Sequence, residues 1–470
     1  MATVRPFQVN NGLEVSLNAN VGTTLSASDY LVNLTGPTTS PSTVFNFTTP
    51  YLDPRITFVR ASNASYRAAN GTIVYASANT PRINYNSNGQ CLGLLIENQI
   101  TNDFTLSSAI GNTSTGLWYL AGGDGPESQA VTFNALTAPD GSNTATFFYH
   151  AKPTVTYKTL GTNFGAFSNR PYTHSVFVKA GGEPYVSFLH FDGQDGINVL
   201  NFYYYFSNNS FSSVSAGSSN CAIISGPTSE PYANGWYRIS YTYHYTSGSS
   251  RYVTHKMDLD YGSAVVGRGF YVWGAQHETN DKPSSYVPTL TSAATRTADF
   301  AFVVDNVGAN NLTSWFNYQQ GTFSVEWNVP YVGTTTGLYS GYPGPISIWR
   351  PDDATNVIGH IFFGDAGTTA NKGIGYESFS NNVNVVYLSP SGFNVSNNTF
   401  FKTSFGYAAN GHVLSCNGNT ATAAVTTTIT PLATKIDIGR SRAGWLYGHV
   451  RSIKYWPTRL SNTDITYTSI

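Results

Sequence analysis

Residues 56–102 read ITFVRASNASYRAANGTIVYASANTPRINYNSNGQCLGLLIENQITN. They form a series of short strand-like runs separated by turn residues. It begins with two such runs, crosses a segment rich in Pro and Asn, and ends in an apolar run at Cys91–Ile96 that Glu97 and Asn98 stop. A short apolar run bounded by turn residues is typical of a buried β-strand. The stretch therefore predicts that the chain folds around strands.

The same pattern continues on both sides of this stretch. Residues 173–179 (THSVFVK), 201–206 (NFYYYF) and 321–327 (GTFSVEW) are further strand-like runs, with Gly, Asn and Ser turns between them. Helical periodicity is almost absent. Short strands that follow one another between turns are the signature of antiparallel sandwiches, so we predict an all-β protein made of tandem antiparallel β-sandwiches.

Composition narrows the functional classes. The chain has 470 residues, enough for two or three domains, and only 10% of them are charged, against about 25% in an average soluble protein. The net charge is −1 and the basic residues are scattered, so there is no electrostatic basis for binding nucleic acid or an anionic membrane. The N-terminus lacks the apolar segment of a signal peptide, and no run is long and apolar enough to span a membrane.

Cysteine and acidic residues give no strong metal signal. Cys91, Cys221 and Cys416 are odd in number and far apart, so we predict free thiols and no zinc site. Acidic pairs at residues 192–196 (DGQDG) and 352–353 could hold Ca²⁺, but neither segment has the length or the bidentate Glu of an EF-hand loop. We therefore predict no metal and no cofactor, with calcium as the open alternative.

Catalytic patterns are also missing. Retaining glycoside hydrolysis needs two carboxyl groups about 5 Å apart, which strands supply through patterns such as E-x-D-x-x-E. Glu326 stands alone on its predicted strand, and the chain contains no G-x-S-x-G nucleophile motif. We therefore predict that the protein is not an enzyme, and polysaccharide depolymerase is the least favoured of its possible functions.

Three groups of motifs resemble segments of tailed-bacteriophage virion proteins, most of them tail-fibre or other structural components. The family pattern TRAS…YxxxG…PRxDY…GLLIEExxTN is matched here within residues 59–102, and His277 stands where that family usually has Leu. The later groups are VWGAQHE, SYVPT and TRTAD at residues 272–278, 285–289 and 295–299, and IGR, LYGHVR and YWP at residues 438–440, 446–451 and 455–457. The resemblance covers most of the chain after residue 50.

The residue pattern and the resemblance together predict three parts. Residues 1–50, which alternate polar and apolar positions, would be an extended N-terminal arm for attachment or oligomerisation, unless they are a frayed terminus. Residues 51–298 would be one or two jelly-roll modules like carbohydrate-binding domains, containing both the Cys91–Ile96 strand and the strand at 272–278. Residues 299–470 would be a concanavalin A/laminin-G-like sandwich, joined through a small, polar linker at residues 289–300.

Glycan binding would use aromatic faces that stack on sugar rings and polar groups that bind hydroxyls. Trp445 with Arg440 and Arg442, in a Gly-containing loop, is the favoured site, and Trp349 is a further candidate. Other aromatic candidates, which could equally fill sandwich cores, are Tyr203, Tyr204, Tyr205, Trp236, Tyr237 and Trp315.

The sequence thus predicts a virion fibre or spike, on tail or capsid, that adsorbs to host-surface glycans and assembles in the host cytoplasm. Because the arm has strand alternation but cannot form a core alone, we expect it to pair with other copies in a homotrimer and to contact other virion proteins. A purely structural decoration or connector protein, which binds only virion proteins, is the main alternative.

Overall fold

The computed structural model describes residues 7–9, 13–15, 37, 39–111, 118–122, 129–153, 158–166, 170–192, 197–215, 221–245, 251–259, 264–304, 312–332, 342–350, 353–363, 373–380, 383–409, 411–423, 435–441 and 444–470. The protein is 56% strand and 4% helix, which confirms the all-β prediction. The described residues contain one α-helix, α1 (Asn462–Thr468), and no helix among them is long and apolar enough to cross a membrane.

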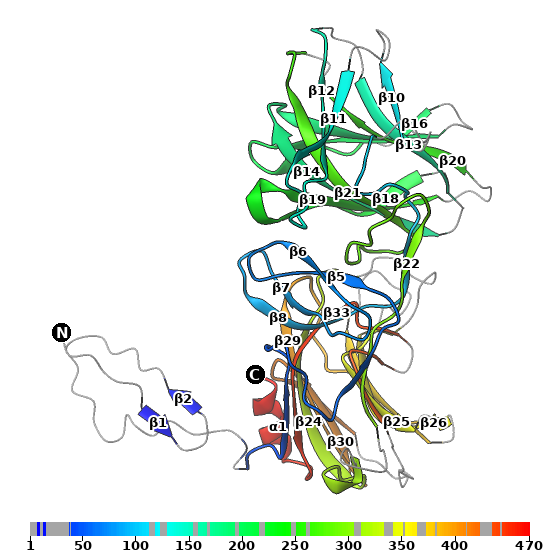
Figure 1. Ribbon diagram of the computed structural model, residues 1–470. Helices are drawn as coiled ribbons and strands as arrows, with labels where there is room; N and C mark the ends of the chain where they lie inside the picture. Colours follow the sequence, from blue (N-terminus) through cyan, green and yellow to red (C-terminus); the bar gives the residue numbers. More distant parts are fainter. Residues whose placement is uncertain are drawn as a thin grey trace, which may run out of the picture.

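Two β-sandwiches are stacked end to end, and we call them the upper and the lower sandwich after their places in Figure 1. The upper sandwich has two six-stranded antiparallel sheets, with strand orders β10-β13-β20-β15-β16-β17 and β11-β12-β21-β14-β19-β18. Its strands are β10 (Tyr119–Gly122), β11 (Gln129–Leu136), β12 (Ala145–His150), β13 (Lys158–Ala166), β14 (Pro171–Gly181), β15 (Tyr185–Asp192), β16 (Ile197–Tyr205), β17 (Ser210–Phe211), β18 (Cys221–Pro231), β19 (Tyr237–Tyr245), β20 (Arg251–Asp258) and β21 (Gly269–Glu278).

The lower sandwich packs a seven-stranded sheet, β28-β27-β26-β25-β32-β23-β4, on a sheet ordered β31-β30-β29-β24-β33-β8-β7, in which β3 also pairs with β33. Its strands are β3 (Thr43–Asn46), β4 (Thr57–Val59), β7 (Ile83–Tyr85), β8 (Cys91–Ile96), β23 (Phe300–Val304), β24 (Gln320–Asn328), β25 (Ile346–Arg350), β26 (Asp353–Phe363), β27 (Ile374–Ser380), β28 (Val383–Leu388), β29 (Phe400–Ala408), β30 (His412–Cys416), β31 (Asn419–Ala423), β32 (Lys435–Ile438) and β33 (Gly448–Trp456).

Strand alternation explains both cores. In β24, Phe323, Val325 and Trp327 point to one side and are fully buried in the lower core. In β14, Val176 and Val178 face the upper core, whereas Phe177 between them is buried on the other face of its sheet. That outer face is covered by the hairpin of β5 (Ala64–Arg67) and β6 (Ile73–Ala76), which lies between the two sandwiches in Figure 1.

The structure corrects the expected division of the chain. We expected Cys91–Ile96 in the same sandwich as residues 272–278, but β8 pairs with β33 of the lower sandwich, Leu94 opposite Val450. β4 likewise pairs with β23. An apolar strand looks the same in sequence whichever sheet it joins, so local pattern could not decide between the two. The upper sandwich is therefore an insertion within the lower one.

Two short strands carry the chain into and out of this insertion. β9 (Ile100–Asn102) pairs antiparallel with β22 (Ala294–Arg296), with Thr101 opposite Thr295. Residues 289–300, expected as a polar linker, thus contain a paired strand. The arm boundary at residue 50 also moves, because β3 belongs to the lower sandwich and Phe45 is buried in its core. Of residues 1–36, the structure describes only the hairpin of β1 (Phe7–Val9) and β2 (Leu13–Val15).

A buried ion-pair network stabilises the place where the chain crosses between the sandwiches. Arg60 Nη1 lies 3.0 Å from Asp299 Oδ1, and Arg82 Nη1 lies 2.8 Å from Glu97 Oε2. Arg82 also pairs with Asp299, and Arg296 Nη2 lies 3.4 Å from Glu97 Oε2. All five side chains are buried, and an unpaired buried charge would cost several kcal/mol. These are the charged residues of VRAS, PRINY, GLLIE and TRTAD, so the motifs that carry the virion resemblance build this junction.

Candidate functional site

The site predicted from sequence is used largely for contacts within the chain. Trp445 is half-buried, its Nε1 donates to the Asp299 carbonyl oxygen at 3.0 Å, and its ring meets Phe300 edge-on at 5.5 Å. The Arg440 guanidinium lies 4.6 Å from the centre of the Trp445 ring. The indole N–H and one face of the Trp445 ring are therefore already in contact with other residues of the chain. Arg442, the third residue of the predicted site, lies outside the described residues.

Trp349 is joined to this group through Asp437. Its Nε1 donates to Asp437 Oδ2 at 2.7 Å, and Arg440 Nη1 lies 3.8 Å from the same oxygen. Lys435 Nζ approaches the Trp349 ring to 5.3 Å. The structure thus brings Trp445, Arg440 and Trp349 into one chain of contacts. These contacts occupy both indole N–H groups, whereas Arg440 Nε has no hydrogen-bond partner among the described atoms.

Three of the other aromatic candidates pack in or against cores, whereas Tyr203, Tyr205 and Tyr237 are half-buried. Trp236 and Tyr204 are fully buried in the upper sandwich, and Trp236 Nε1 donates to the Thr137 carbonyl oxygen at 3.1 Å. Trp315 packs edge-on against Phe45 and Tyr455 in the lower sandwich. For these residues the alternative role, filling a sandwich core, is the one the structure shows.

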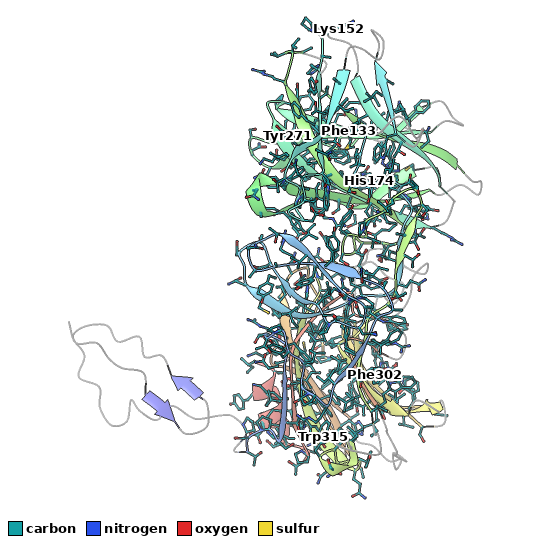
Figure 2. The ribbon with its side chains drawn as sticks, in the orientation of Figure 1. Phe133, Lys152, His174, Tyr271, Phe302 and Trp315 are labelled. Carbon is teal, nitrogen blue, oxygen red and sulfur yellow. The ribbon has the colours of Figure 1, made fainter. Side chains whose placement is uncertain are left out.

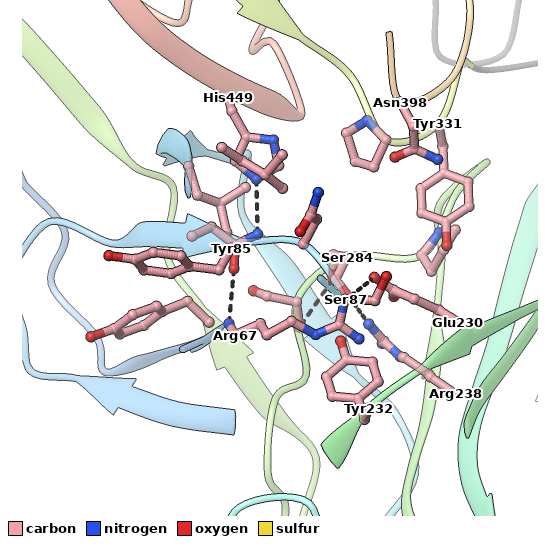
Figure 3. Close-up of a pocket in the computed structure, with 18 of the residues that line it drawn as sticks. Arg67, Tyr85, Ser87, Glu230, Tyr232, Arg238, Ser284, Tyr331, Asn398 and His449 are labelled. Atoms are coloured by element: carbon pink, nitrogen blue, oxygen red, sulfur yellow. Dashed lines mark hydrogen bonds and ion pairs between the residues drawn. The ribbon is translucent and has the colours of Figure 1, made fainter. Parts of the chain in front are cut away.

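A cleft of about 660 Å³ lies at the junction of the two sandwiches, and none of the predicted site residues lines it. Its lining comes from parts of the chain that are distant in sequence: the segment from β5 to Glu97, the end of β18 with the start of β19, the crossing loop at residues 283–286, the lower-sandwich loops around residues 328–331 and 397–400, and His449 of β33. Figure 3 shows Arg67, Glu230, Tyr232 and Arg238 grouped together, with His449, Asn398 and Tyr331 across from them.

Arg67 is the central charge of the cleft. It is 4% exposed, and its Nη1 lies 2.8 Å from Glu230 Oε1 while its Nη2 donates to the Pro231 carbonyl oxygen. The Tyr232 ring lies 3.5 Å from the guanidinium carbon, so the two groups stack. Arg67 Nε has no hydrogen-bond partner among the residues described. The guanidinium is therefore held in place by contacts within the chain, and its unpartnered Nε is buried from solvent.

Arg238 lies behind this group. It stands opposite Glu230 on paired strands, and its guanidinium donates to the Ser284 carbonyl oxygen and to Ser175 Oγ, both at 2.8 Å. Its Nε, like that of Arg67, lacks a partner among the described atoms. Burial raises the pKa of nearby Glu278, and the positive charge of Arg238 offsets part of this rise.

Polar groups of the lower sandwich line the other side of the cleft. Asn84 Nδ2 lies 2.8 Å from His449 Nε2, and His449 Nδ1 lies 2.7 Å from Asn328 Oδ1. Burial lowers the pKa of His449 to about 3, so the ring is neutral and donates through Nδ1. Burial also raises the pKa of Tyr331 to about 12, which keeps its hydroxyl protonated as a donor.

The cleft therefore combines hydroxyl and amide groups, tyrosine rings and a fixed guanidinium–carboxylate pair. Sequence reasoning missed it because its residues meet only through the fold. Arg67 and Glu230 are 163 positions apart, and neither stands out locally. Arg67 lies in the YRAANG segment of the virion-like motif, which was the one available signal.

No metal centre is found within the part of the chain that the structure describes. No group of three or more His, Cys, Asp or Glu side chains there could hold an ion. The DGQDG segment and residues 352–353, the two calcium candidates, fall mostly outside the described residues. Cys91, Cys221 and Cys416 are not joined in disulfides, as predicted.

Comparison with known proteins adds little to this description. No family model matches the chain, and no curated protein matches it in sequence. Among solved structures, a toad ovary galectin in complex with N-acetylgalactose is similar over 30% of this chain and 92% of its own, at 10% identity and a TM-score of 0.22.

Two further solved structures are similar at the same level. Domain 4 of AbnA, a GH43 extracellular arabinanase from Geobacillus stearothermophilus, in complex with arabinotriose, covers 40% of this chain and 82% of its own, at 11% identity and a TM-score of 0.26. Domains LG4-5 of the mouse laminin alpha1 chain cover 64% of this chain and 88% of their own, at 9% identity and a TM-score of 0.22. These scores place no residue of a site, so the geometry of the cleft has to carry the functional argument.

Proposed function

We propose that this protein binds glycans without catalysis, in the cleft between its sandwiches, as an exposed fibre or spike of a tailed-bacteriophage virion. The observation that carries the binding is the Arg67–Glu230 pair stacked on Tyr232. It places a fixed guanidinium, a carboxylate whose side chain is 40% exposed and an aromatic ring within one cleft, and sugar recognition combines polar groups with aromatic rings.

Binding without catalysis is supported by the state of the cleft carboxylates. Glu97 and Glu230 are the acidic residues among the described lining. Burial alone would raise the pKa of Glu97, but the charges of Arg296 and Arg82 and hydrogen bonds from Ser285 outweigh burial and lower that pKa to about 2. A carboxyl group that stays ionised cannot act as the general acid of a glycosidase. Glu97 therefore cannot be the proton donor of a hydrolysis in this cleft, and Glu230 is held in an ion pair with Arg67.

The virion setting is supported by the motifs and by the composition. VRAS, PRINY, GLLIE and TRTAD resemble segments of tailed-phage structural proteins, and a surface with few charges and many hydroxyl and amide groups suits an exposed appendage. In this proposal the protein forms a homotrimer, its N-terminal segment contacts other virion proteins, and the cleft faces the host surface.

A second candidate function is a purely structural connector that binds only virion proteins. A stack of partly exposed rings on the upper sandwich favours it: Phe147 lies 4.6 Å from Tyr271 and 5.0 Å from Tyr149, measured between ring centres. Figure 2 shows Tyr271, together with Phe133, which is exposed, on this part of the molecule. Aromatic side chains gathered on a surface are typical of protein interfaces.

A matched pair of variants tests glycan binding. Ser87 is an exposed turn residue that lines the cleft, and Asn88 is its exposed neighbour outside the lining. We expect Ser87→Trp to fill the cleft and abolish binding on an array of host-surface glycans, and Asn88→Trp to bind like the unmodified protein. Should no glycan bind the unmodified protein, or should Ser87→Trp bind normally, the connector function would replace this proposal.

A further inference from the structure

We propose that the lower sandwich carries a second binding site, on the outer face of its seven-stranded sheet, which takes a positively charged ammonium group. The site consists of the Glu377 carboxylate and three aromatic rings, those of Tyr342, Phe362 and Tyr387. None of these four residues lines the cleft, so the proposal stands independently of glycan binding there. The sheet that carries them includes β25 and β26, on the right of the lower sandwich in Figure 1.

Strand alternation and register bring these residues to one face. In β26, Ile361 is buried in the lower core, so its neighbours His360 and Phe362 point away from that core. Glu377 of β27 pairs with His360 on one side and with Tyr387 of β28 on the other, so it shares their face. The outer face therefore presents a carboxylate between a histidine and a tyrosine.

Phe362 lies at the base of the aromatic group. It is buried, and its ring lies against Gly375, where any larger side chain would collide with it. Tyr342, in the segment before β25, meets Phe362 edge-on at 5.3 Å between ring centres. Tyr387 lies 6.4 Å from Phe362 on the β28 side of the sheet. Both tyrosines are exposed, so two accessible rings flank a buried one.

Glu377 supplies the negative charge of the site. Its Oε2 lies 3.2 Å from His360 Nε2, and its Oε1 accepts from Asn384 Nδ2 at 3.1 Å, so the carboxylate is held in place. Each carboxylate oxygen can accept a further hydrogen bond, and 22% of the side chain is exposed. Within the described part of the chain, no Lys or Arg lies within ion-pair distance of Glu377.

The same face already holds one ammonium group in such a setting. Lys435 Nζ lies 2.8 Å from Asp437 Oδ1. It also lies 4.5 Å from the centre of the Phe302 ring and 5.3 Å from that of the Trp349 ring. Strand register places Asp437 and Glu377 in one row across the sheet, which runs through Phe302, Asp437, Ser347, His360, Glu377 and Tyr387. Because aromatic faces and carboxylates both attract cations, the group around Glu377 offers this setting to a cation from outside the chain.

The ligand is therefore a molecule with an accessible ammonium group. An amino sugar and a choline headgroup share this chemistry, and two pairs of probes distinguish them. A glucosamine trimer is compared with the N-acetylglucosamine trimer, which has the same sugar rings without positive charge, and phosphocholine is compared with inorganic phosphate. The net charge of the chain is only −1, so a cation is attracted to the rest of its surface weakly.

Calorimetric titration of the full-length protein at pH 7.0 decides between the outcomes. We expect at least one ammonium probe to bind, and its counterpart without the ammonium group to bind about tenfold more weakly or less, the size of a lost charge-assisted hydrogen bond. Binding of the glucosamine trimer alone assigns an amino sugar, and binding of phosphocholine alone assigns a choline headgroup. If neither probe binds, or if each counterpart binds as tightly as its probe, the proposal is wrong.

Substitutions locate the contact. Glu377→Gln keeps the size of the side chain but removes its charge, and Tyr387→Ala removes an exposed ring. Tyr51→Ala is the matched control, because Tyr51 is an exposed tyrosine before β4, the strand at the opposite edge of the sheet. We expect binding to weaken about tenfold in Glu377→Gln and about fivefold in Tyr387→Ala, and to stay unchanged in Tyr51→Ala.

The cleft variant separates the two sites. Ser87→Trp should bind the ammonium probe like the unmodified protein, whatever it does to binding of other glycans. Loss of the ammonium probe in Ser87→Trp would place its binding in the cleft and overturn the proposal. Urea unfolding verifies that each variant is folded, and if Glu377→Gln or Tyr387→Ala is not, the other decides. Unchanged binding in a folded variant of either residue would also overturn the proposal.

Discussion

Acidification should unfold the upper sandwich, because its core contains four buried histidines. His174, His190, His255 and His277 come from β14, β15, β20 and β21 and are at most 4% exposed. Their rings touch one another: the centres of His190 and His255 are 3.9 Å apart, and those of His174 and His255 are 4.7 Å apart. Figure 2 shows His174 inside the upper sandwich.

The cluster is held neutral in the folded protein. Burial lowers the pKa of all four histidines, and for His174, His190 and His255 the neighbouring histidines lower it further. Asp103, whose Oδ2 lies 3.5 Å from His277 Nδ1, raises the pKa of His277 and so offsets part of the effect of burial on that ring. Three tyrosines also contact the cluster: Tyr241 and Tyr243 through their hydroxyls, and Tyr172 through its ring, which stacks on His277 at 5.1 Å. A tyrosine ordinarily has a pKa of about 10 and so carries no charge at these pH values.

The sign and size of the effect follow from linkage. In the unfolded chain a histidine has a pKa of about 6.5, so below that pH the unfolded state binds more protons than the folded state and stability falls as the pH falls. Each histidine then lowers the free energy of unfolding by about 1.4 kcal/mol for every pH unit below its unfolded pKa, or by about 2 kcal/mol at pH 5. Four histidines give an upper limit of about 8 kcal/mol, comparable with the whole stability of a domain, about 5–15 kcal/mol.

The stability of the lower sandwich should fall less on acidification. Three of its described histidines are buried, and burial lowers the pKa of two of them, His412 and His449, to about 4 and about 3. We expect urea unfolding at pH 7.5, 6.5, 5.5 and 5.0 to show an upper transition that moves to lower urea about twice as fast as the lower one. His255→Phe, which removes the ring between the other histidines, should reduce the pH dependence of the upper transition by about a quarter. Unfolding midpoints that do not change between pH 7.5 and 5 would refute the reasoning.

Three further outcomes are expected from the architecture. Asp299→Asn removes the negative charge that pairs with the buried guanidinium groups of Arg60 and Arg82. It should lower the free energy of unfolding, measured in urea, by about 3–5 kcal/mol. Residues 299–470 alone lack β4, β7 and β8 and should be insoluble, whereas replacing residues 103–293 by a short Gly-containing turn between β9 and β22 should leave a soluble β-rich protein by circular dichroism. Trp445→Phe removes the indole hydrogen bond to Asp299 and should cost about 1 kcal/mol, while glycan binding stays unchanged because Trp445 lies outside the cleft.

Individual strands could be predicted from sequence, because alternation and turn residues are local. The run at residues 321–327 is within β24, Gln320–Asn328, and the run at residues 173–179 is within β14. Sheet membership could not be predicted. β8 joins β33 some 350 positions later, and this pairing, together with that of β4 and β23, shows that the upper sandwich is an insertion. A strand's own sequence specifies that it is a strand and which of its faces is buried, but not its partner.

The site was missed for a related reason. Trp445 and Arg440 look like a binding pair in sequence, since an aromatic ring beside guanidinium groups in a loop is the same pattern whether it contacts a ligand or another part of the chain. In the structure the indole N–H is bonded to Asp299 and the guanidinium covers the ring. Arg67 and Glu230 look ordinary in sequence and become a candidate site only because β5 and β18 meet.

The motifs and the cleft are nevertheless connected through one loop. Ser285 donates its N–H and its hydroxyl to the Glu97 carboxylate of the buried network, and the carbonyl oxygen of the preceding residue, Ser284, accepts from Arg238 in the cleft. The network therefore fixes the loop that positions Arg238, while Arg67 and Glu230 contact the ligand space directly. It follows that proteins with the same charged motifs can share this junction and still differ in what they bind, since changing Glu230 leaves every ion pair of the network in place.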